Sequence, residues 1–396
     1  MREHFDIVVS GGGIAGLTAA AAFGSAGYSV LCVDPTPPVM AESDPASDLR
    51  TTAFLQPSVK VLEAAGLWER FAAHAMPLQV MRIVDAGGET PEPRVSHDFD
   101  ASDISDQPFG WNLPNWLLRR ECVARLSELD TVRFRPGIGT TTLLTRETEA
   151  LVGLSDGTRV SARLLIAADG RNSPMRAALG IGVRTTRFGQ KALAFAVTHP
   201  VPHDNVSTEI HRSGGPFTFV PLPDRDGQPC SAIVWMETGA EALRLAALPV
   251  DAFEVEMGRR SCGLFGPLKL ASRRTVWPII SQIAERFNGE RTALMAEAAH
   301  VVPPIGAQGL NMSLADLTAL MDLATPDGLG NPVMLHAYHR KRYPDVALRV
   351  AGVGMLNRAS MITARPLRDA RATILNALYS TAPVRRALMQ MGIGVR

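Results

Sequence analysis

The chain has 396 residues and a mass of 42.5 kDa, which is too long for one ordinary domain and favours two domains or one with insertions. Hydrophobic residues make up 46% and charged residues 20%, so disorder and coiled coil are excluded and a large core is expected. The net charge of +1 argues against nucleic-acid binding by the whole chain. Residues 340–396, however, hold 11 Lys and Arg against 2 Asp and Glu. This basic segment predicts an anionic partner or surface for that part alone.

The first 34 residues have the pattern of one strand–helix–strand unit. Residues 5–9 are a short β-branched run typical of a buried parallel strand. A glycine-rich turn follows, then an alanine-rich stretch at 17–26 that predicts a helix, and a second strand at 29–33. Residues 7–33 carry no charge, but their six glycines and the mixed residues before them argue against a membrane span or signal peptide.

The turn carries G-x-G-x-x-G, with Gly11, Gly13 and Gly16 in the three positions. The first glycine permits the tight turn, the second lets a pyrophosphate approach, and the third lets helix and sheet pack closely. Phosphates are attracted to the free N–H groups at the helix N-terminus. Asp34, at the end of the second strand, is placed to accept hydrogen bonds from a ribose. The unit predicts a dinucleotide site and does not distinguish NAD from FAD.

Four further segments, in this order, select the flavin: residues 48–54, 164–176, 293–300 and 304–311. Together they resemble the FAD-dependent aromatic hydroxylases, most closely the branch that hydroxylates the ring of ubiquinone precursors, over nearly the whole chain. The resemblance implies an α/β fold. It has a Rossmann-like FAD-binding domain of the para-hydroxybenzoate hydroxylase type, an inserted antiparallel-sheet substrate domain and a C-terminal helical segment.

The resemblance assigns roles to single residues. Asp169 and Gly170 match the Asp-Gly motif that shapes the FAD and pyridine-nucleotide sites; the alternative is a strand-end aspartate before a glycine turn. Arg50 matches the arginine that borders the flavin, against a solvated loop arginine. Arg119 matches an arginine near the cofactor's ribose and phosphates, although Cys122 replaces the family's leucine there.

Ala296-Glu297 departs from the family, which usually has Gly-Asp. Glu297 keeps a carboxylate for a ribitol or ribose hydroxyl, one methylene further out, while alanine restricts the backbone more than glycine does. We expect a shifted loop or weakened FAD binding. His300 matches a family position, where a structural hydrogen bond is expected rather than catalysis.

The segment from Pro304 to Leu310 is predicted to meet the flavin ring. Pro304 is expected to line the ring face by resemblance. After Gln308 and Gly309, leucines at helical spacing from Leu310 onward predict a buried amphipathic helix. Its N-terminal amides would face the flavin N1–C2=O edge and stabilise the anionic reduced form.

The family reaction is NAD(P)H- and O₂-dependent hydroxylation through a flavin C4a-hydroperoxide. The implied substrate is a small hydrophobic phenol, here a prenylated ubiquinone precursor. No metal is expected, because the flavin itself would supply the oxygen-activating chemistry. No second complete glycine motif occurs, so NAD(P)H would dock transiently on the flavin domain, or another protein would donate electrons. The alternatives are another flavin oxidoreductase, such as a reductase or epoxidase, or a non-catalytic flavin-fold subunit of a lipid-biosynthetic assembly. No catalytic base is identified.

Three regions are expected. The FAD-binding domain comprises residues 1–75, 112–185 and 285–330, the substrate domain residues 76–111 and 186–284, and the C-terminal helical segment residues 331–396. Short apolar runs between Gly/Pro/Asp-rich turns predict the antiparallel sheet, at 192–197, 217–222, 232–236 and 276–280. Candidate substrate-lining residues are Phe195, Phe217, Phe219, Trp235 and Trp277, with ordinary sheet core as the alternative.

The C-terminal segment is predicted to be helical, with breaks at Pro344 and Pro366. One face of it collects Leu367, Ile374, Leu375 and Leu378, and Arg365, Arg368, Arg371, Arg385 and Arg386 add positive charge. Such a helix either rests on anionic lipid or a biosynthetic complex, or packs on its own flavin domain. Four scattered cysteines suggest a reducing cytosol. The expected location is therefore cytoplasmic or peripheral on the inner membrane. The sequence does not specify the oligomeric state.

Overall fold

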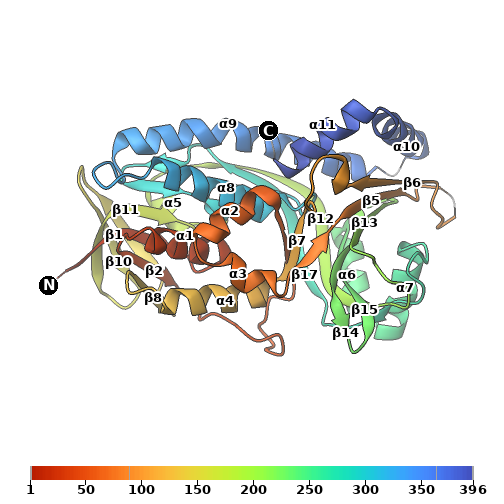
Figure 1. Cartoon of the computed structure of the whole chain (residues 1–396), viewed down its shortest axis with the longest axis horizontal. Helices are drawn as coiled ribbons and strands as arrows, with labels where there is room; N and C mark the ends of the chain where they lie inside the picture. The colour runs from red at the N-terminus through yellow and green to blue at the C-terminus, as the bar shows by residue number, and fades with distance from the viewer. Residues whose placement is uncertain (1, 89, 363, 395–396) are drawn as a thin grey trace.

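The structure, a computed structural model, describes residues 2–88, 90–362 and 364–394. Two bodies lie side by side, each built around its own β-sheet, and helix α9 runs along one long edge of the molecule (Figure 1). The predicted α/β fold is confirmed in both of its parts, the dinucleotide-binding unit and the second, mainly antiparallel sheet.

The first sheet has eight strands with a parallel centre. Its order is β18 (Asn288–Gly289), β19 (Thr292–Leu294), β11 (Arg159–Ala167), β1 (Glu3–Ser10), β2 (Val30–Asp34) and β8 (Val132–Pro136), while β10 (Ala150–Leu154) pairs β11 and β9 (Thr140–Thr145). Ile7 of β1 lies opposite Leu164 and Val30, and all three are buried, as expected for a strand covered on both faces. The carboxyl ends of β1, β2 and β11 therefore meet at one edge, where ligands of such sheets bind.

Helices cover this sheet. They are α1 (Ile14–Ser25), α2 (Gln56–Ala64), α3 (Trp68–Ala72), α4 (Asn115–Ser127), α5 (Pro174–Ala178) and α8 (Gln308–Leu323). The alanine-rich α1 is buried along almost its whole length, because it packs against β2 and against α2, α4 and α8. Small side chains allow this close approach, so the composition of residues 17–26 is explained by packing.

The second sheet has nine strands. Its order is β20 (His300–Val301), β17 (Thr275–Ala284), β12 (Val183–Thr198), β15 (Gln228–Thr238), β14 (Pro216–Arg225), β13 (Val206–His211), β5 (Val80–Asp85) and β6 (Val95–Asp100), with β16 (Lys269–Leu270) on β12. All four predicted runs lie in its strands. It is antiparallel except where β13 pairs β5 in parallel. Helices α6 (Gly239–Ala247) and α7 (Val250–Arg260) cover one face.

A small antiparallel sheet of β3 (Thr51–Leu55), β7 (Gly110–Pro114) and β4 (Met76–Leu78) is the third sheet, and β7 also contacts β14 of the second sheet. The 3₁₀ turns are η1 (Ala101–Asp103) and η2 (Ala296–Ala298). Residues 300–301, expected in the flavin domain, pair with β17 of the second sheet. The division into domains stays a prediction.

The C-terminal segment forms α9 (Pro332–Ser360), α10 (Arg365–Ser380) and α11 (Ala382–Ile393). The predicted break at Pro344 is wrong, because α9 continues through it. Proline removes one helical hydrogen bond; the buried side chains Tyr338, Arg342 and Val346 on both sides hold the helix together. Pro366 stands in the first turn of α10, where proline is favoured.

Among the described helices, none combines the length and the apolarity that crossing a bilayer requires.

Candidate flavin site

The glycine turn between β1 and α1 is built for close approach. Gly11 has φ +112°, and a Cβ there would lie 2.3 Å from the Ala168 carbonyl oxygen. A Cβ at Gly16 would lie 2.0 Å from the Gly11 oxygen. A Cβ at Gly13 would meet nothing within 4 Å, and no side chain caps the helix that begins after it. The free amides of α1 therefore face open space, as a pyrophosphate site requires.

Asp34 lies against this turn. Its Oδ2 accepts the Gly12 N–H at 2.6 Å, and its Oδ1 accepts the Thr36 N–H at 2.8 Å. The carboxylate thus fixes the turn as well as being placed for a ribose, since each oxygen has a second lone pair.

Asp169 and Gly170 follow β11 beside the same turn. Asp169 Oδ2 accepts the Met175 N–H at 3.2 Å and the Ser10 hydroxyl at 3.4 Å, while its buried Oδ1 has no partner among the described residues. Burial raises the pKa of Asp169. Gly170 has φ +84° with open space beside it. Buried acceptors such as Asp169 Oδ1 normally accept a hydrogen bond, and a ribose or ribitol hydroxyl of the cofactor would be a suitable donor.

Arg50 and Glu297 come together from distant segments. Arg50 donates to both oxygens of Asp48, at 2.8 and 2.7 Å, and its guanidinium lies 5.4 Å from the Trp277 ring centroid. The hydrogen bond to Asp48 raises the pKa of Arg50, and the nearby charge of Glu297 adds to this. Asp48, which the sequence left without a role, is the partner that orients Arg50.

The Ala296-Glu297 turn adopts the glycine-like backbone in spite of its alanine. Ala296 has φ +54°, a left-handed conformation that costs an L-residue about 1–2 kcal/mol. It is buried at the start of η2, while Glu297 is exposed. Ala296, which stands where the family usually has glycine, therefore keeps the glycine-like backbone at the cost of strain.

The turn before α8 has two consecutive left-handed residues, Gly306 (φ +63°) and Ala307 (φ +54°). The predicted helix begins at Gln308, with no side-chain cap at Ala307. The first amides, including those of Gly309 and Leu310, therefore lack intrahelical partners. Pro304 is exposed just before this turn.

The Gln308 side chain makes hydrogen bonds to its own turn and to two C-terminal helices. Its Nε2 donates to the Gly306 oxygen at 2.9 Å and the Gly392 oxygen at 3.1 Å, and its Oε1 accepts from Arg349 at 2.8 Å. The side chain therefore ties α8 to α9 and α11.

Arg119, on α4, is half-buried and makes no hydrogen bond or ion pair with the described residues. Nothing connects it directly to the other predicted site residues.

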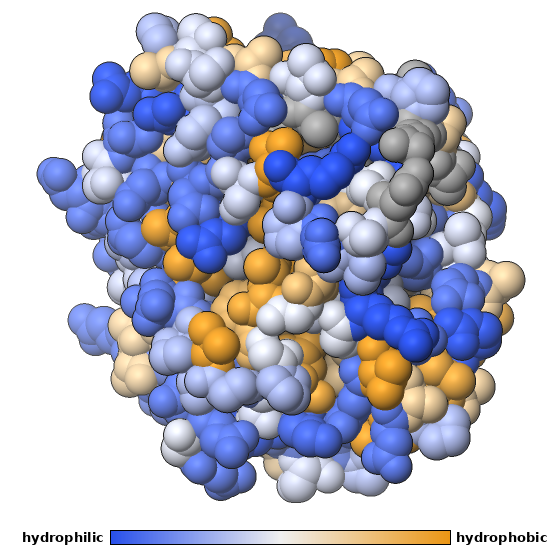
Figure 2. Space-filling view, turned by 90° about the vertical axis from the view of Figure 1, so that its right-hand side faces the viewer, coloured by the Kyte–Doolittle hydropathy of each residue, from blue (hydrophilic) through white to orange (hydrophobic). Residues whose placement is uncertain are grey.

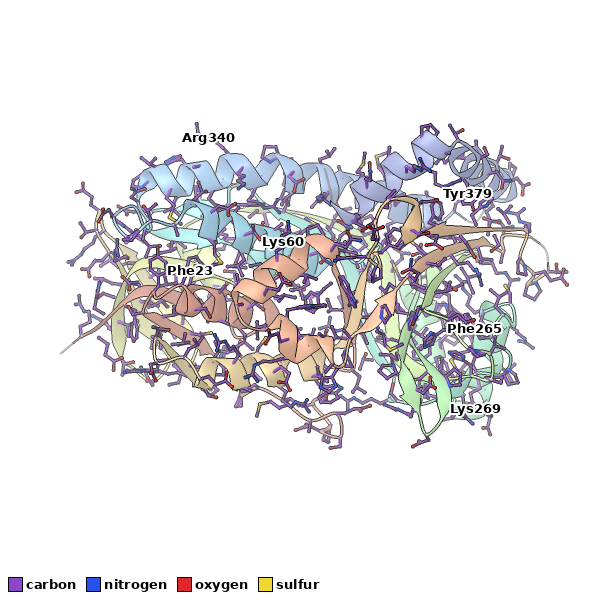
Figure 3. The ribbon with its side chains drawn as sticks, in the orientation of Figure 1. Phe23, Lys60, Phe265, Lys269, Arg340 and Tyr379 are labelled. Atoms are coloured by element: carbon purple, nitrogen blue, oxygen red, sulfur yellow. The ribbon has the colours of Figure 1, made fainter. Side chains whose placement is uncertain are left out.

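The predicted substrate-lining residues divide between the two faces of the second sheet. Phe195, Phe217, Phe219 and Trp235 pack in one core with the α7 residues and with Phe265, which Figure 3 shows within this body. They are therefore ordinary core. Trp277 lies in a different cluster, on the face that meets the turn before α8: Ala192, Met236, Ile279, Ile305 and Val353 with Trp277, Phe188, Val234 and Val302. Alternation along the strands separates the two sets of residues, but it does not reveal which set faces the flavin.

His300 makes the expected structural hydrogen bond, from Nε2 to Asp316 Oδ2 at 2.6 Å. Among the described residues, no group of three or more His, Cys, Asp and Glu side chains is arranged to hold a metal. The polar groups of the site suit a dinucleotide: the free amides and one arginine can donate hydrogen bonds to phosphates, and the carboxylates can accept them from hydroxyl groups.

Fold and site together define a dinucleotide-binding flavoprotein of mixed α/β architecture. The model of the FAD binding domain family matches residues 4–351. The ubiquinone hydroxylase UbiL of Rhodospirillum rubrum is 31% identical over 98% of this chain and 89% of its own. The 3-demethoxyubiquinol 3-hydroxylase of Escherichia coli is 24% identical over the full length of both chains. The p-nitrophenol 4-monooxygenase PnpA of Pseudomonas putida superposes over the full length of both chains with a TM-score of 0.79 at 17% identity.

The chain belongs to the FAD binding domain family. Within it, the chain is an FAD-dependent monooxygenase of the ubiquinone hydroxylase type, and FAD is its cofactor. NAD(P)H is the reductant typical of this family.

Proposed function

We propose that the protein hydroxylates an aromatic ring carbon of a phenolic, prenylated ubiquinone precursor. The observation that carries this proposal is the similarity to the ubiquinone hydroxylase UbiL over 98% of the chain. The apolar sheet face around Ala192, Met236 and Trp277 supports it, because a hydrophobic ring needs a dry wall close to the flavin.

The residues described above would bind different parts of FAD. The α1 amides and Gly13 would receive the pyrophosphate, Asp34 and Asp169 the hydroxyls of the cofactor, and the α8 amides the flavin edge. Bound FAD, once reduced by NAD(P)H, supplies the oxygen-activating chemistry. The polypeptide orients the ring and excludes water. A reductase or epoxidase on this scaffold would share all these features and differ only in product.

The direct test combines purified protein, FAD, NAD(P)H and a short-chain prenylated phenol under ¹⁸O₂. We expect NAD(P)H oxidation that rises with the phenol, and a product with one labelled oxygen. Deletion of the gene in its host should cause an unhydroxylated quinone precursor to accumulate, and complementation should reverse this. Oxidation of NAD(P)H without labelled product would favour the reductase alternative.

We also propose that the surface formed by α10 and α11 docks on an anionic membrane and so receives a prenylated substrate. Exposed apolar side chains lie at helical spacing on each helix: Ile374 and Leu378 on α10, and Val384, Leu388 and Met391 on α11. Leu367 and Leu375 were predicted to share this face, and their side chains lie outside the described residues, as do those of Arg365 and Arg371. Residues 365–393, which form the two helices, hold five arginines and one carboxylate, so the apolar residues among them suit an anionic bilayer better than a neutral one.

The opposite side of α10 contacts the protein. Figure 3 shows Tyr379 at this end of the molecule. Its ring stacks on His97 with the centroids 4.0 Å apart, and it meets Phe99 of β6 edge-on with the centroids 5.4 Å apart. The described side chains of α10 thus pack on the second sheet, whereas the alternative raised by the sequence was packing on the flavin domain. Figure 2 shows this end of the molecule, with apolar patches between charged ones.

The double substitution Ile374→Ser and Leu378→Ser should reduce co-sedimentation with liposomes that contain anionic lipid at least threefold. Val255→Ser, an exposed apolar position on α7, is the matched control and should bind as the parent does. Equal binding of the parent to zwitterionic and anionic liposomes, or to neither, would contradict the proposal.

A further inference from the structure

Asp316 is a fully buried carboxylate on α8 that binds three groups from elsewhere. Oδ2 accepts from His300 Nε2 at 2.6 Å and from the Ala296 N–H at 3.2 Å. Oδ1 accepts from Arg342 Nε at 2.8 Å. Burial favours the neutral acid, but the charges of His300 and Arg342 keep the pKa of Asp316 below its usual value. The group therefore acts as an anionic acceptor in the core.

Two of its partners, Ala296 and His300, flank Glu297. Ala296 has a left-handed backbone conformation, which glycine adopts without strain but alanine does not. Its carbonyl oxygen accepts the Ala299 N–H at 2.9 Å. A relaxed Ala296 would turn the next peptide and move the Glu297 carboxylate away from Arg50. The conformation of one alanine therefore decides where the predicted cofactor ligand lies.

We propose that Asp316 is a positioning residue for the flavin site: it holds Ala296 in the left-handed conformation and so places Glu297 at the cofactor. A glycine at position 296 would reach this backbone unaided. In this chain the buried carboxylate compensates for the missing glycine. The proposal depends on FAD binding and is independent of the substrate.

The test is a cycle of three variants: Asp316→Asn, Ala296→Gly and the pair. FAD dissociation constants are measured by flavin fluorescence titration of apoprotein, and melting temperatures by circular dichroism. We expect Asp316→Asn to weaken FAD binding about tenfold and Ala296→Gly to leave it within twofold of the parent. The pair should recover most of the lost affinity, because glycine no longer needs the carboxylate.

A purely structural role for Asp316 predicts a different result. The two substitutions would then act additively, and Ala296→Gly would restore no affinity; that outcome overturns the proposal. Asp322→Asn is the matched control, because Asp322 lies on the same helix and pairs with the exposed Lys341 at 2.9 Å. It should bind FAD as the parent does.

A second variant covers the case in which Asp316→Asn does not fold. Ala296→Val leaves Asp316 in place but resists the left-handed region, since β-branched residues are outliers there. We expect it to bind FAD at least fivefold more weakly than Ala296→Gly. Equal affinities of these two variants would also overturn the proposal.

Discussion

Asp169 is proposed to bind a hydroxyl group of the cofactor, and its burial lowers the stability of the apoprotein. Its pKa is raised by burial, and its Oδ1 lacks a partner among the described residues. A raised folded-state pKa means that the folded protein favours the neutral acid, so the charged form destabilises it at neutral pH. Below pH 3.8, the ordinary pKa of an aspartate, Asp169 is protonated in both the folded and the unfolded protein and no longer destabilises the fold.

Asp169→Asn should therefore raise the melting temperature of the apoprotein at pH 7, and the gain should shrink as the pH falls toward 4. FAD affinity should fall about tenfold, since a charge-assisted hydrogen bond is lost. Calorimetry of apoprotein across this pH range and FAD titration at pH 7 check both. The exposed Asp130→Asn should change neither, and a gain in stability that is independent of pH would refute the explanation.

At the scale of single residues, the sequence predicts several site residues but not the side-chain contacts that hold them. Gly11 and Gly16 follow from spacing, because a tight turn leaves little choice of residue, and Asp34 follows from its place at the end of the second strand. The pairing of Arg50 with Asp48 is local, but the spacing of the two residues does not by itself indicate it. Other features depend on contacts between elements: the hydrogen bond from Gln308 to Gly392 and the burial of Asp316 against His300. No local pattern encodes such contacts.

Two glycines of the turn between β1 and α1 are expected to serve different purposes, Gly16 in folding and Gly13 in FAD binding. A Cβ at Gly16 meets backbone at 2.0 Å, whereas one at Gly13, with its φ of −68°, meets nothing. Gly16→Ala should lower the unfolding free energy of the apoprotein by about 1–3 kcal/mol. Gly13→Ala should leave that stability unchanged and weaken FAD binding by more than tenfold, because the methyl group would enter the space proposed for the pyrophosphate.

Chemical denaturation of apoprotein and FAD titration distinguish these effects. Gly258→Ala, an exchange in α7 where a Cβ also meets nothing within 4 Å, controls for the substitution itself. If Gly13→Ala binds FAD as the parent does, the pyrophosphate does not lie on this turn.

Element types were easier to predict than their ends and breaks. The strands of the second sheet carry strong apolar runs between turn residues, and all four predicted runs form strands. Pro344 failed as a break, because local propensity is overridden when side chains before and after the proline are buried. Which sheet face holds the aromatic core depends on where α6 and α7 pack, and the strand pattern contains no such information.

At the scale of the whole molecule, the C-terminal helix α11 supports the turn before α8. Met389 and Ile393 are buried with Leu55 and Phe109, and Gly392 beside them accepts the hydrogen bond from Gln308. Arg349 of α9 also donates to Gln308 and pairs with Asp345. Contacts from two C-terminal helices thus converge on the first residue of α8.

Met389→Ala with Ile393→Ala should detach α11, since each truncation of a buried side chain costs about 2–5 kcal/mol. Hydrogen exchange should rise in residues 382–394 and, through the lost Gln308 contact, in residues 306–309. Leu388→Ala on the exposed side of α11 should change neither segment. Unaltered exchange at 306–309 would show that the turn is held without α11.

The hydrogen bond between Gln308 and Gly392 spans 84 residues of sequence. The ribosome makes the glycine turn of β1 and α1 first, whereas the turn proposed to meet the flavin edge contacts a residue that is synthesised much later. A nascent chain that stops before residue 392 carries a nucleotide fold with an unfinished ring pocket. Cofactor capture should therefore be a late event in biogenesis, and free FAD should protect only polypeptides that have passed this point from proteolysis.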